Sequence, residues 1–256
     1  MSFSRFFIIW CCLRNKRSYN RTKGGVIMIQ YYTAIGRYEL RTGSNGAKQP
    51  VLLNSSRSYE PSLCEMLLWS SLLWHIRDQQ ELEIVFAKRK QELHICDEYS
   101  LAYYCTRLEH LGFLHIGSGY TAADALFELM APLNPVPATA GFGSRLCSFL
   151  HLVFRRRVPL SVACRVLHQD RLVPHEQQIM DLLSQNSLST AELIACIDQN
   201  LHDVRDSSVL MERIYSDSAL TCDNLPAYVR ASDHLIPVLQ TLTNLYLRRL
   251  LVLERY

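Results

Sequence analysis

The sequence lacks the residue spacings that catalytic and metal sites ordinarily require. It contains no HExxH, GxSxG, phosphate-loop or dinucleotide-binding pattern. Its nine cysteines are an odd number and include no paired CxxC or Cys/His spacing of a zinc site. We therefore expect a protein that is not an enzyme and holds no metal or cofactor. Its cysteines are expected to be reduced thiols in the cytoplasm.

Long apolar runs are also absent. The longest run near the start, Phe6 to Leu13, is far shorter than the roughly 20 residues of a membrane-spanning helix. In contrast, 48% of the 256 residues are apolar, which suffices for the core of one large domain or two small ones. We expect a globular protein that does not span a membrane.

Acidic residues are missing from residues 1–27, which contain six Lys or Arg. The remainder has 21 basic and 24 acidic side chains, so its net charge is −3. Trp10-Cys11-Cys12 does not form the small-residue cleavage site of a signal peptide. Codons for Lys23 to Val26 can instead contain a bacterial ribosome-binding sequence, and Met28 follows closely. We interpret residues 1–27 as a non-native upstream extension or a disordered segment of a bacterial protein that starts at Met28. The intact mass of the natively expressed protein tests this.

Residues 28–61 predict an N-terminal β-hairpin arm. Tyrosine and β-branched residues precede a turn-forming cluster at 43–46 and a second apolar run at 50–54. Four basic and two acidic residues give the arm a net charge of +2. The arm is either an edge hairpin packed on the core or an extension that touches a partner or a phosphate backbone.

Two helices are predicted to follow, at 62–77 and 81–93. Ser62 and Glu65 form a capping-box pattern at the start of the first helix. Apolar residues surround nearly its whole circumference, so one face needs a second burial partner. That partner is either a second subunit or the other half of the chain. The second helix carries three consecutive cations, Lys88, Arg89 and Lys90.

The stretch 97–121 predicts a third helix followed by a β-hairpin. Apolar residues at helical spacing face the core: Leu101, Cys105, Leu108 and Leu111. Aromatic and polar residues occupy the opposite face: Tyr99, Tyr103, Arg107 and His110. Gly112 is expected to end the helix. Residues 113–116 suit a strand, 117–119 (Gly-Ser-Gly) a tight turn, and Tyr120 the start of the return strand.

Three helices followed by a glycine-bounded wing are typical of a winged helix. In this plan residues 62–133, with YSLAYYCTRLEHLGFL and IGSGY, resemble the bacterial winged helix-turn-helix transcription regulators, broadly the MarR and PadR-like groups. The resemblance implies a homodimer on duplex DNA. DNA contacts would come from the third helix (Tyr103, Thr106, Arg107, His110), the wing (His115, Ser118) and the cations of the second helix (Lys88, Arg89, Lys90).

The C-terminal half begins after 134–143, a segment with two prolines and two glycines that predicts a linker. Residues 144–157 suit a helix ending in Arg155-Arg156-Arg157, which are either phosphate contacts or cations that suit a helix C-terminus. Ser189 to Glu192 opens a further helix, 233–250 forms a long one, and 251–253 suits a strand. The expected fold is mainly α with small β-hairpins. Residues 144–256 form a helical domain that resembles a degenerate second winged helix.

Charge distinguishes two possible functions. Residues 62–133 have five basic and ten acidic side chains, and residues 174–256 have six and eleven, so each region has a net charge of −5. DNA affinity depends largely on phosphate neutralisation. We expect a DNA-binding regulator whose C-terminal half serves dimerisation or signal input; the alternative is a non-enzymatic adaptor whose acidic winged helices bind protein. A continuous positive face joining Arg107 to Lys88–Lys90 favours the regulator.

Overall fold

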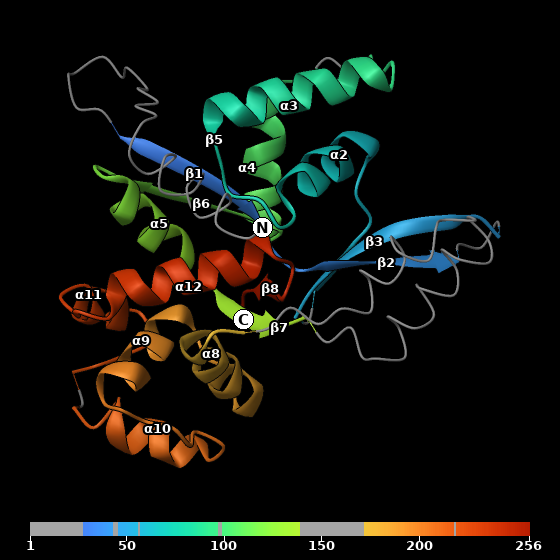
Figure 1. Cartoon of the computed structure of the whole chain (residues 1–256). Coiled ribbons are helices and arrows are strands. Elements are labelled where there is room, and N and C mark those ends of the chain that lie inside the picture. Colours follow the sequence, from blue (N-terminus) through green and yellow to red (C-terminus); the bar gives the residue numbers. More distant parts are fainter. Residues whose placement is uncertain (1–27, 43–45, 56, 97–98, 139–171, 218) are drawn as a thin grey trace.

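The computed structural model describes residues 28–42, 46–55, 57–96, 99–138, 172–217 and 219–256 (Figure 1). They form a mixed α/β fold with three small antiparallel sheets, so the expectation of a mainly helical protein with small β elements is confirmed only in outline. The helix predicted at 144–157, its arginines 155–157 and the upstream segment 1–27 lie outside the described residues.

The first sheet combines three strands from distant parts of the chain. β1 (Ile29–Ala34) lies between β5 (Arg77–Asp78) and β6 (Leu114–Gly119). The expected turn at 117–119 is therefore wrong, because these residues belong to β6 and pair with β1 instead of a return strand. A Cβ on Gly117 would lie 2.3 Å from the backbone nitrogen of Leu129. The glycines of β6 allow close packing of the following helix, α5 (Ala122–Met130).

Three helices pack beside this sheet, close to the ranges that the sequence predicts. They are α2 (Leu63–Leu72), α3 (Gln79–Glu92) and α4 (Leu101–Leu111). The capping box of Ser62 and Glu65 is present, although α2 ends at Leu72, before the expected residue 77. Gly112 ends α4 in the left-handed region (φ 80°), as expected. Helix existence was thus predictable from local signals.

The region around α2 is buried within the chain. The indole nitrogen of Trp69, a fully buried residue, donates to the carbonyl of Ile35 (3.0 Å). Just beyond the helix, the indole nitrogen of Trp74 donates to the carbonyl of Leu251 in the C-terminal half (3.2 Å). Of the two burial partners considered for this apolar helix, these contacts fit the other half of the same chain.

The N-terminal arm forms a second sheet, in the order β2-β3-β4. Its strands are β2 (Arg37–Thr42), β3 (Lys48–Asn54) and β4 (Arg57–Tyr59). β3 buries Val51 and Leu52 against the core, whereas all six residues of β2 are exposed. The arm therefore rests on the core through β3, with β2 at its outer edge.

The C-terminal half contains helices α8 (Pro174–Gln185), α9 (Thr190–Asp198), α10 (Ser207–Arg213), α11 (Leu225–Val229) and α12 (Leu235–Leu247). A third sheet pairs β7 (Asn134–Pro137) with β8 (Leu251–Glu254). Residues 134–137 were expected in a linker, and this is wrong. Prolines are tolerated in β7 because a two-stranded sheet has only edge strands.

The two halves repeat one backbone arrangement. α4 is followed by Gly112, and α12 is followed one residue later by Arg249, both in the left-handed region with φ of 80° and 63°. Corresponding backbone hydrogen bonds then run from Phe113 N–H to the Leu108 carbonyl and from Leu250 N–H to the Leu245 carbonyl. Each helix leads into a strand that pairs antiparallel with the strand opening its own half: β6 with β1, and β8 with β7.

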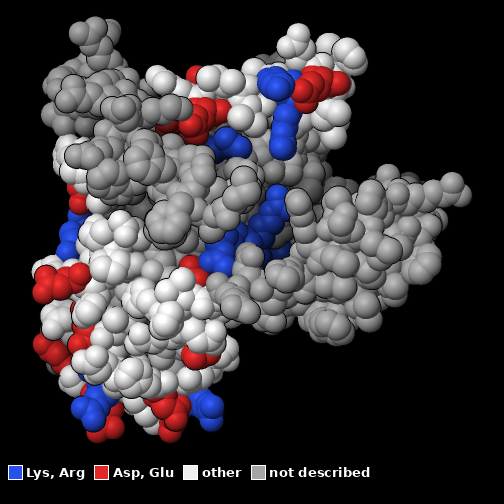
Figure 2. Space-filling model, viewed as in Figure 1, with Lys and Arg blue, Asp and Glu red and all other residues white. Residues whose placement is uncertain are grey.

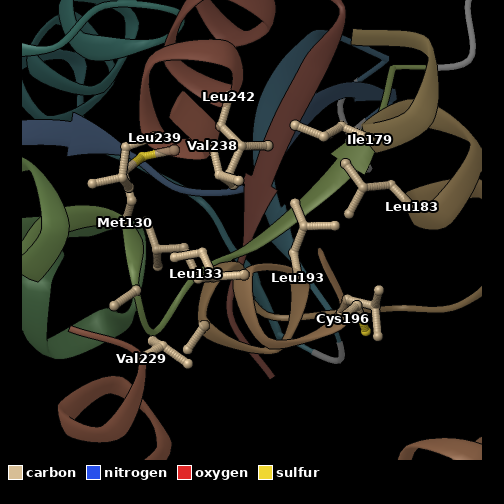
Figure 3. Close-up of a cluster of buried hydrophobic side chains, with 14 of the residues drawn as sticks. Met130, Leu133, Ile179, Leu183, Leu193, Cys196, Val229, Val238, Leu239 and Leu242 are labelled. Carbon is tan, nitrogen blue, oxygen red and sulfur yellow. The ribbon is translucent and has the colours of Figure 1, made fainter. Parts of the chain in front are cut away.

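A shared core and a buried hydroxyl join the halves. Figure 3 shows Met130 and Leu133, at the end of α5 and beyond, among Val238, Leu239 and Leu242 of α12. The fully buried Tyr246 hydroxyl accepts hydrogen bonds from Thr33 Oγ1 (3.0 Å) and the backbone N–H of Trp74 (3.0 Å). α12 is thereby fixed against β1 and the end of α2.

Candidate functional site on the outer face of α4

The amphipathic pattern of α4 produces one buried and one exposed side. Cys105 and Leu108 are buried, as expected, together with Tyr104, which the apolar pattern did not include. The exposed side includes Ala102 and four of the residues predicted to contact DNA: Tyr103, Thr106, Arg107 and His110. These four also line a surface pocket of about 410 Å³ with Leu111. We call this surface, together with Tyr99, the α4 face.

A buried carboxylate beneath the α4 face holds Arg107. Glu65 Oε1 lies 2.8 Å from Arg107 Nε, and the two side chains are 2% and 48% exposed. Tyr59 donates its hydroxyl to the same carboxylate (2.8 and 2.9 Å), and the backbone N–H of Ser62 donates to Oε2 (2.7 Å). Burial and the hydrogen bond to Glu65 raise the pKa of Tyr59. A buried charge needs such partners, so Arg107 neutralises Glu65 and ties α4 to α2.

Stacked aromatic rings continue the α4 face toward its N-terminal end. The Tyr99 and Tyr103 rings stack with centroids 4.5 Å apart, and Tyr103 meets Tyr104 edge-on at 5.3 Å. The Tyr103 hydroxyl accepts from Arg107 Nη1 (3.0 Å), and hydrogen bonds to Tyr103 and Tyr59 raise the pKa of Arg107. The aromatic rings and the guanidinium thus form one connected surface.

Two further pockets adjoin the α4 face. One of about 410 Å³ reaches the start of α2 and the α3–α4 connection; its lining includes the exposed Leu63 and Cys96. The other, about 760 Å³, lies at the opposite end of α4, beside Arg57, His110 and Arg255. Together the three pockets border α4 along its length, so the surface is both concave and aromatic.

The cations of α3 have other partners. Lys88 Nζ lies 3.9 Å from the Glu92 carboxylate, and Lys90 Nζ lies 5.7 Å from the Phe86 ring centroid. Arg89 is half-buried and donates to the hydroxyls of Ser70 and Ser71 on α2 (3.3 and 3.0 Å). In Figure 2, basic and acidic side chains lie next to one another over α3 and again over α10. These contacts link the three cations to Glu92, to Phe86 and to the serines of α2, not to Arg107.

The two residues predicted for a wing lie elsewhere. His115 and Ser118 belong to β6 and pair with Thr33 and Gln30 of β1, so their assignment to a wing is wrong. His115 is half-buried, and burial, followed by the charge of Arg255, lowers its pKa to about 4. Among the described residues its Nδ1 has no hydrogen-bond partner. Neither residue belongs to the α4 face.

Sequence reasoning missed the residues that hold the α4 face in place. Tyr59 was not singled out, and Glu65 was identified only as a helix cap. One signal was present: Glu65 is the only charged residue of α2, and a buried carboxylate requires a cation. Leu63 and Cys96 are 33 positions apart in the sequence. They line the same pocket only because of how α2 and α4 pack.

The described residues contain no cluster of three or more His, Cys, Asp and Glu side chains suited to a metal. None of the helices described is both long and apolar enough to cross a bilayer. Comparison of the chain with protein-family models, curated proteins and solved structures finds no match.

Proposed function

We propose that this protein is a non-enzymatic adaptor that binds another protein through the α4 face. One observation carries the proposal: Arg107, the cation expected to contact DNA, is paired with the buried carboxylate of Glu65. The remaining exposed side is aromatic and small polar. Aromatic residues and arginine are enriched in the centres of protein interfaces, where they contribute most of the binding energy.

The scaffold is proposed to be a tandem of winged-helix-like units. The order α2, α3, α4 and β6, with the sheet β5-β1-β6, supports this for the first half. The second half repeats the helix end and the strand pairing. Only the first unit presents this helix freely, because the corresponding α12 is largely buried. One half therefore binds, and the other supports it.

A DNA-binding regulator is the second candidate. It is favoured by the position of α4 as the third helix of such a unit, with Thr106 and His110 exposed. Against it stand the net charge of −5 over residues 62–133 and the paired cations of α3. A duplex contact through this face would have to rely on few free positive charges.

A photo-crosslinking amino acid at Thr106 tests the adaptor in cells that naturally produce the protein. Thr106 is exposed on the α4 face, so its replacement leaves the Glu65–Arg107 pair intact. The adaptor predicts a discrete crosslinked protein that is absent when the same group replaces Glu212, an exposed residue of α10. Addition of Tyr99→Ser should weaken the crosslink.

DNA binding tests the second candidate, the regulator. Salt-dependent titration of random and upstream-region DNA is compared for wild type and Thr106→Asp, whose added charge repels phosphate. Salt-sensitive binding that Thr106→Asp abolishes, with no protein crosslink, would replace the adaptor with the regulator.

A further inference from the structure

The outer edge of the second sheet is open to a further strand. Within the described residues β2 pairs only with β3, and all six of its residues are exposed. In Figure 1, β2 and β3 extend away from α2, α3 and α4. An exposed edge presents unpaired backbone N–H and C=O groups, with which another strand can form a ladder.

Pro50 indicates which residues of β2 direct their backbone groups outward. Antiparallel partners alternate between pairs that exchange hydrogen bonds and pairs that do not. Leu40 lies opposite Pro50, which has no N–H to donate, so this position suits a pair without hydrogen bonds. Leu40 then directs its N–H and C=O to the open edge, as do its alternate neighbours Tyr38 and Thr42.

The charges along β2 are complementary to a second β2 in one register. Antiparallel pairing about Leu40 places Leu40 opposite Leu40 of another copy, and Glu39 opposite Arg41 twice. It also aligns the outward groups of residues 38, 40 and 42. Pairing about Glu39 would instead oppose Glu39 to itself and Arg37 to Arg41; pairing about Arg41 would oppose Arg41 to itself. Like charges directly opposite are destabilising, which disfavours these two registers. Pairing about Tyr38 would oppose Arg37 to Glu39, but β2 begins at Arg37 and the Arg37 guanidinium lies 3.9 Å from Glu254, so the register about Leu40 combines complementary charge with the longer pairing.

We propose that β2 pairs with β2 of a second copy of this chain, antiparallel about Leu40, joining two three-stranded sheets into one. In the single chain Arg41 and Glu39 lie 3.7 Å apart on the exposed strand, so both are available to exchange partners across the twofold axis. The strand is short, and its pairing buries less than the roughly 1,200 Å² of a stable interface. The dimer is therefore weak. It is independent of the partner proposed for the α4 face.

Sedimentation equilibrium of the full chain over a range of concentrations tests the pairing. Wild type should show a monomer–dimer equilibrium with a dissociation constant on the order of micromolar or weaker. Glu39→Arg alone and Arg41→Glu alone should each weaken it by about tenfold or more, because each places like charges opposite one another twice. The matched control Glu212→Arg, on α10, should dimerise as wild type does.

Two rescue experiments show whether a single variant loses dimerisation through like charges in the proposed register or through misfolding. An equimolar mixture of Glu39→Arg and Arg41→Glu should form a heterodimer, since opposite charges face one another again. The double variant Glu39→Arg/Arg41→Glu should dimerise with itself. Leu40→Pro removes an outward N–H and should abolish pairing while circular dichroism stays unchanged. A wild type that remains monomeric, single variants that dimerise like wild type, or a mixture without heterodimers would overturn the proposal.

Discussion

The Glu65 carboxylate and the Arg107 guanidinium, 2.8 Å apart, form an ion pair that is buried at one end and half-exposed at the other. The buried end stabilises the contact of α2 with α4, and the exposed end contributes to the α4 face. Substitution of either residue should therefore affect both folding and the recognition that we propose for this face. A binding experiment on Arg107 needs a stability measurement beside it.

Glu65→Ala should lower the free energy of unfolding by about 2–4 kcal/mol. The change removes a helix cap and leaves the Tyr59 hydroxyl and the Arg107 guanidinium without their carboxylate. Arg107→Ala should also destabilise, because a buried carboxylate then loses its cation. Urea denaturation measures both. Thr106→Ala, one position away on the exposed side, should unfold like wild type; equal midpoints for all three variants would contradict the structural role of the pair.

Tyr246→Phe should lower the free energy of unfolding by about 1–3 kcal/mol. The variant keeps the buried ring but removes the oxygen that accepts from Thr33 Oγ1 and Trp74 N–H. The Thr33 hydroxyl can still donate to the His75 carbonyl (3.2 Å), whereas the Trp74 N–H loses its acceptor. Thermal unfolding gives the difference. Tyr228→Phe, at a residue 66% exposed, is the control with the same chemical change and should have no measurable effect.

Gly117→Ala should destabilise more than Ser118→Ala at the neighbouring position. Its added Cβ would meet the Leu129 nitrogen at 2.3 Å and the Ala125 carbonyl oxygen at 2.4 Å, so α5 would have to move from β6. Overpacking of this kind costs about 1–3 kcal/mol or more. Chemical denaturation of Gly117→Ala beside Ser118→Ala tests the strand assignment. In the hairpin that the sequence predicted, the added Cβ would meet no helix, and the cost would be the backbone strain of a turn position alone.

Stability should decrease as the pH falls from about 6.5 toward 4. Burial and Arg255 lower the pKa of His115 from 6.5 to about 4 in the folded chain, so in this window the unfolded state binds the proton and the folded state does not. His115 contributes a slope of at most about 1.4 kcal/mol per pH unit, which falls to roughly half near pH 6.5 and fades within about one further pH unit. Denaturation midpoints between pH 4 and 8 should lose this component in His115→Phe. NMR titration of the imidazole tests the pKa directly, and an ordinary value would contradict the prediction.

Signals from neighbouring residues predicted much of this fold. The features that they did not predict depend on strands that are distant in the sequence and pair with one another. The Ser62–Glu65 capping box and the left-handed Gly112 each depend on a few neighbouring residues, and both were identified from the sequence. Gly117 is ambiguous locally, because a glycine that allows a turn also allows close packing of a helix on a strand. Only the pairing of β1 with β6 decides between them.

The candidate site follows the same division. Helical periodicity identified the exposed side of α4, including Tyr103 and Arg107. It gave no information on Glu65, which comes 42 positions earlier than Arg107, or on Tyr59 from the second sheet. Arg107 is paired with a carboxylate buried beneath it. This pairing follows from the packing of α2 against α4, which the sequence did not reveal.

The hydrogen bond between Thr33 and Tyr246 spans 213 residues of sequence. A ribosome must therefore add most of the chain after β1 before this hydrogen bond forms, and the Gly36 N–H likewise waits for the Leu253 carbonyl. Contacts so distant in sequence slow folding, because a long loop must close before they form. During synthesis β5, β1 and β6 can pair once Gly119 has been made, but the side of β1 that contacts Tyr246 stays uncovered until α12 has been made.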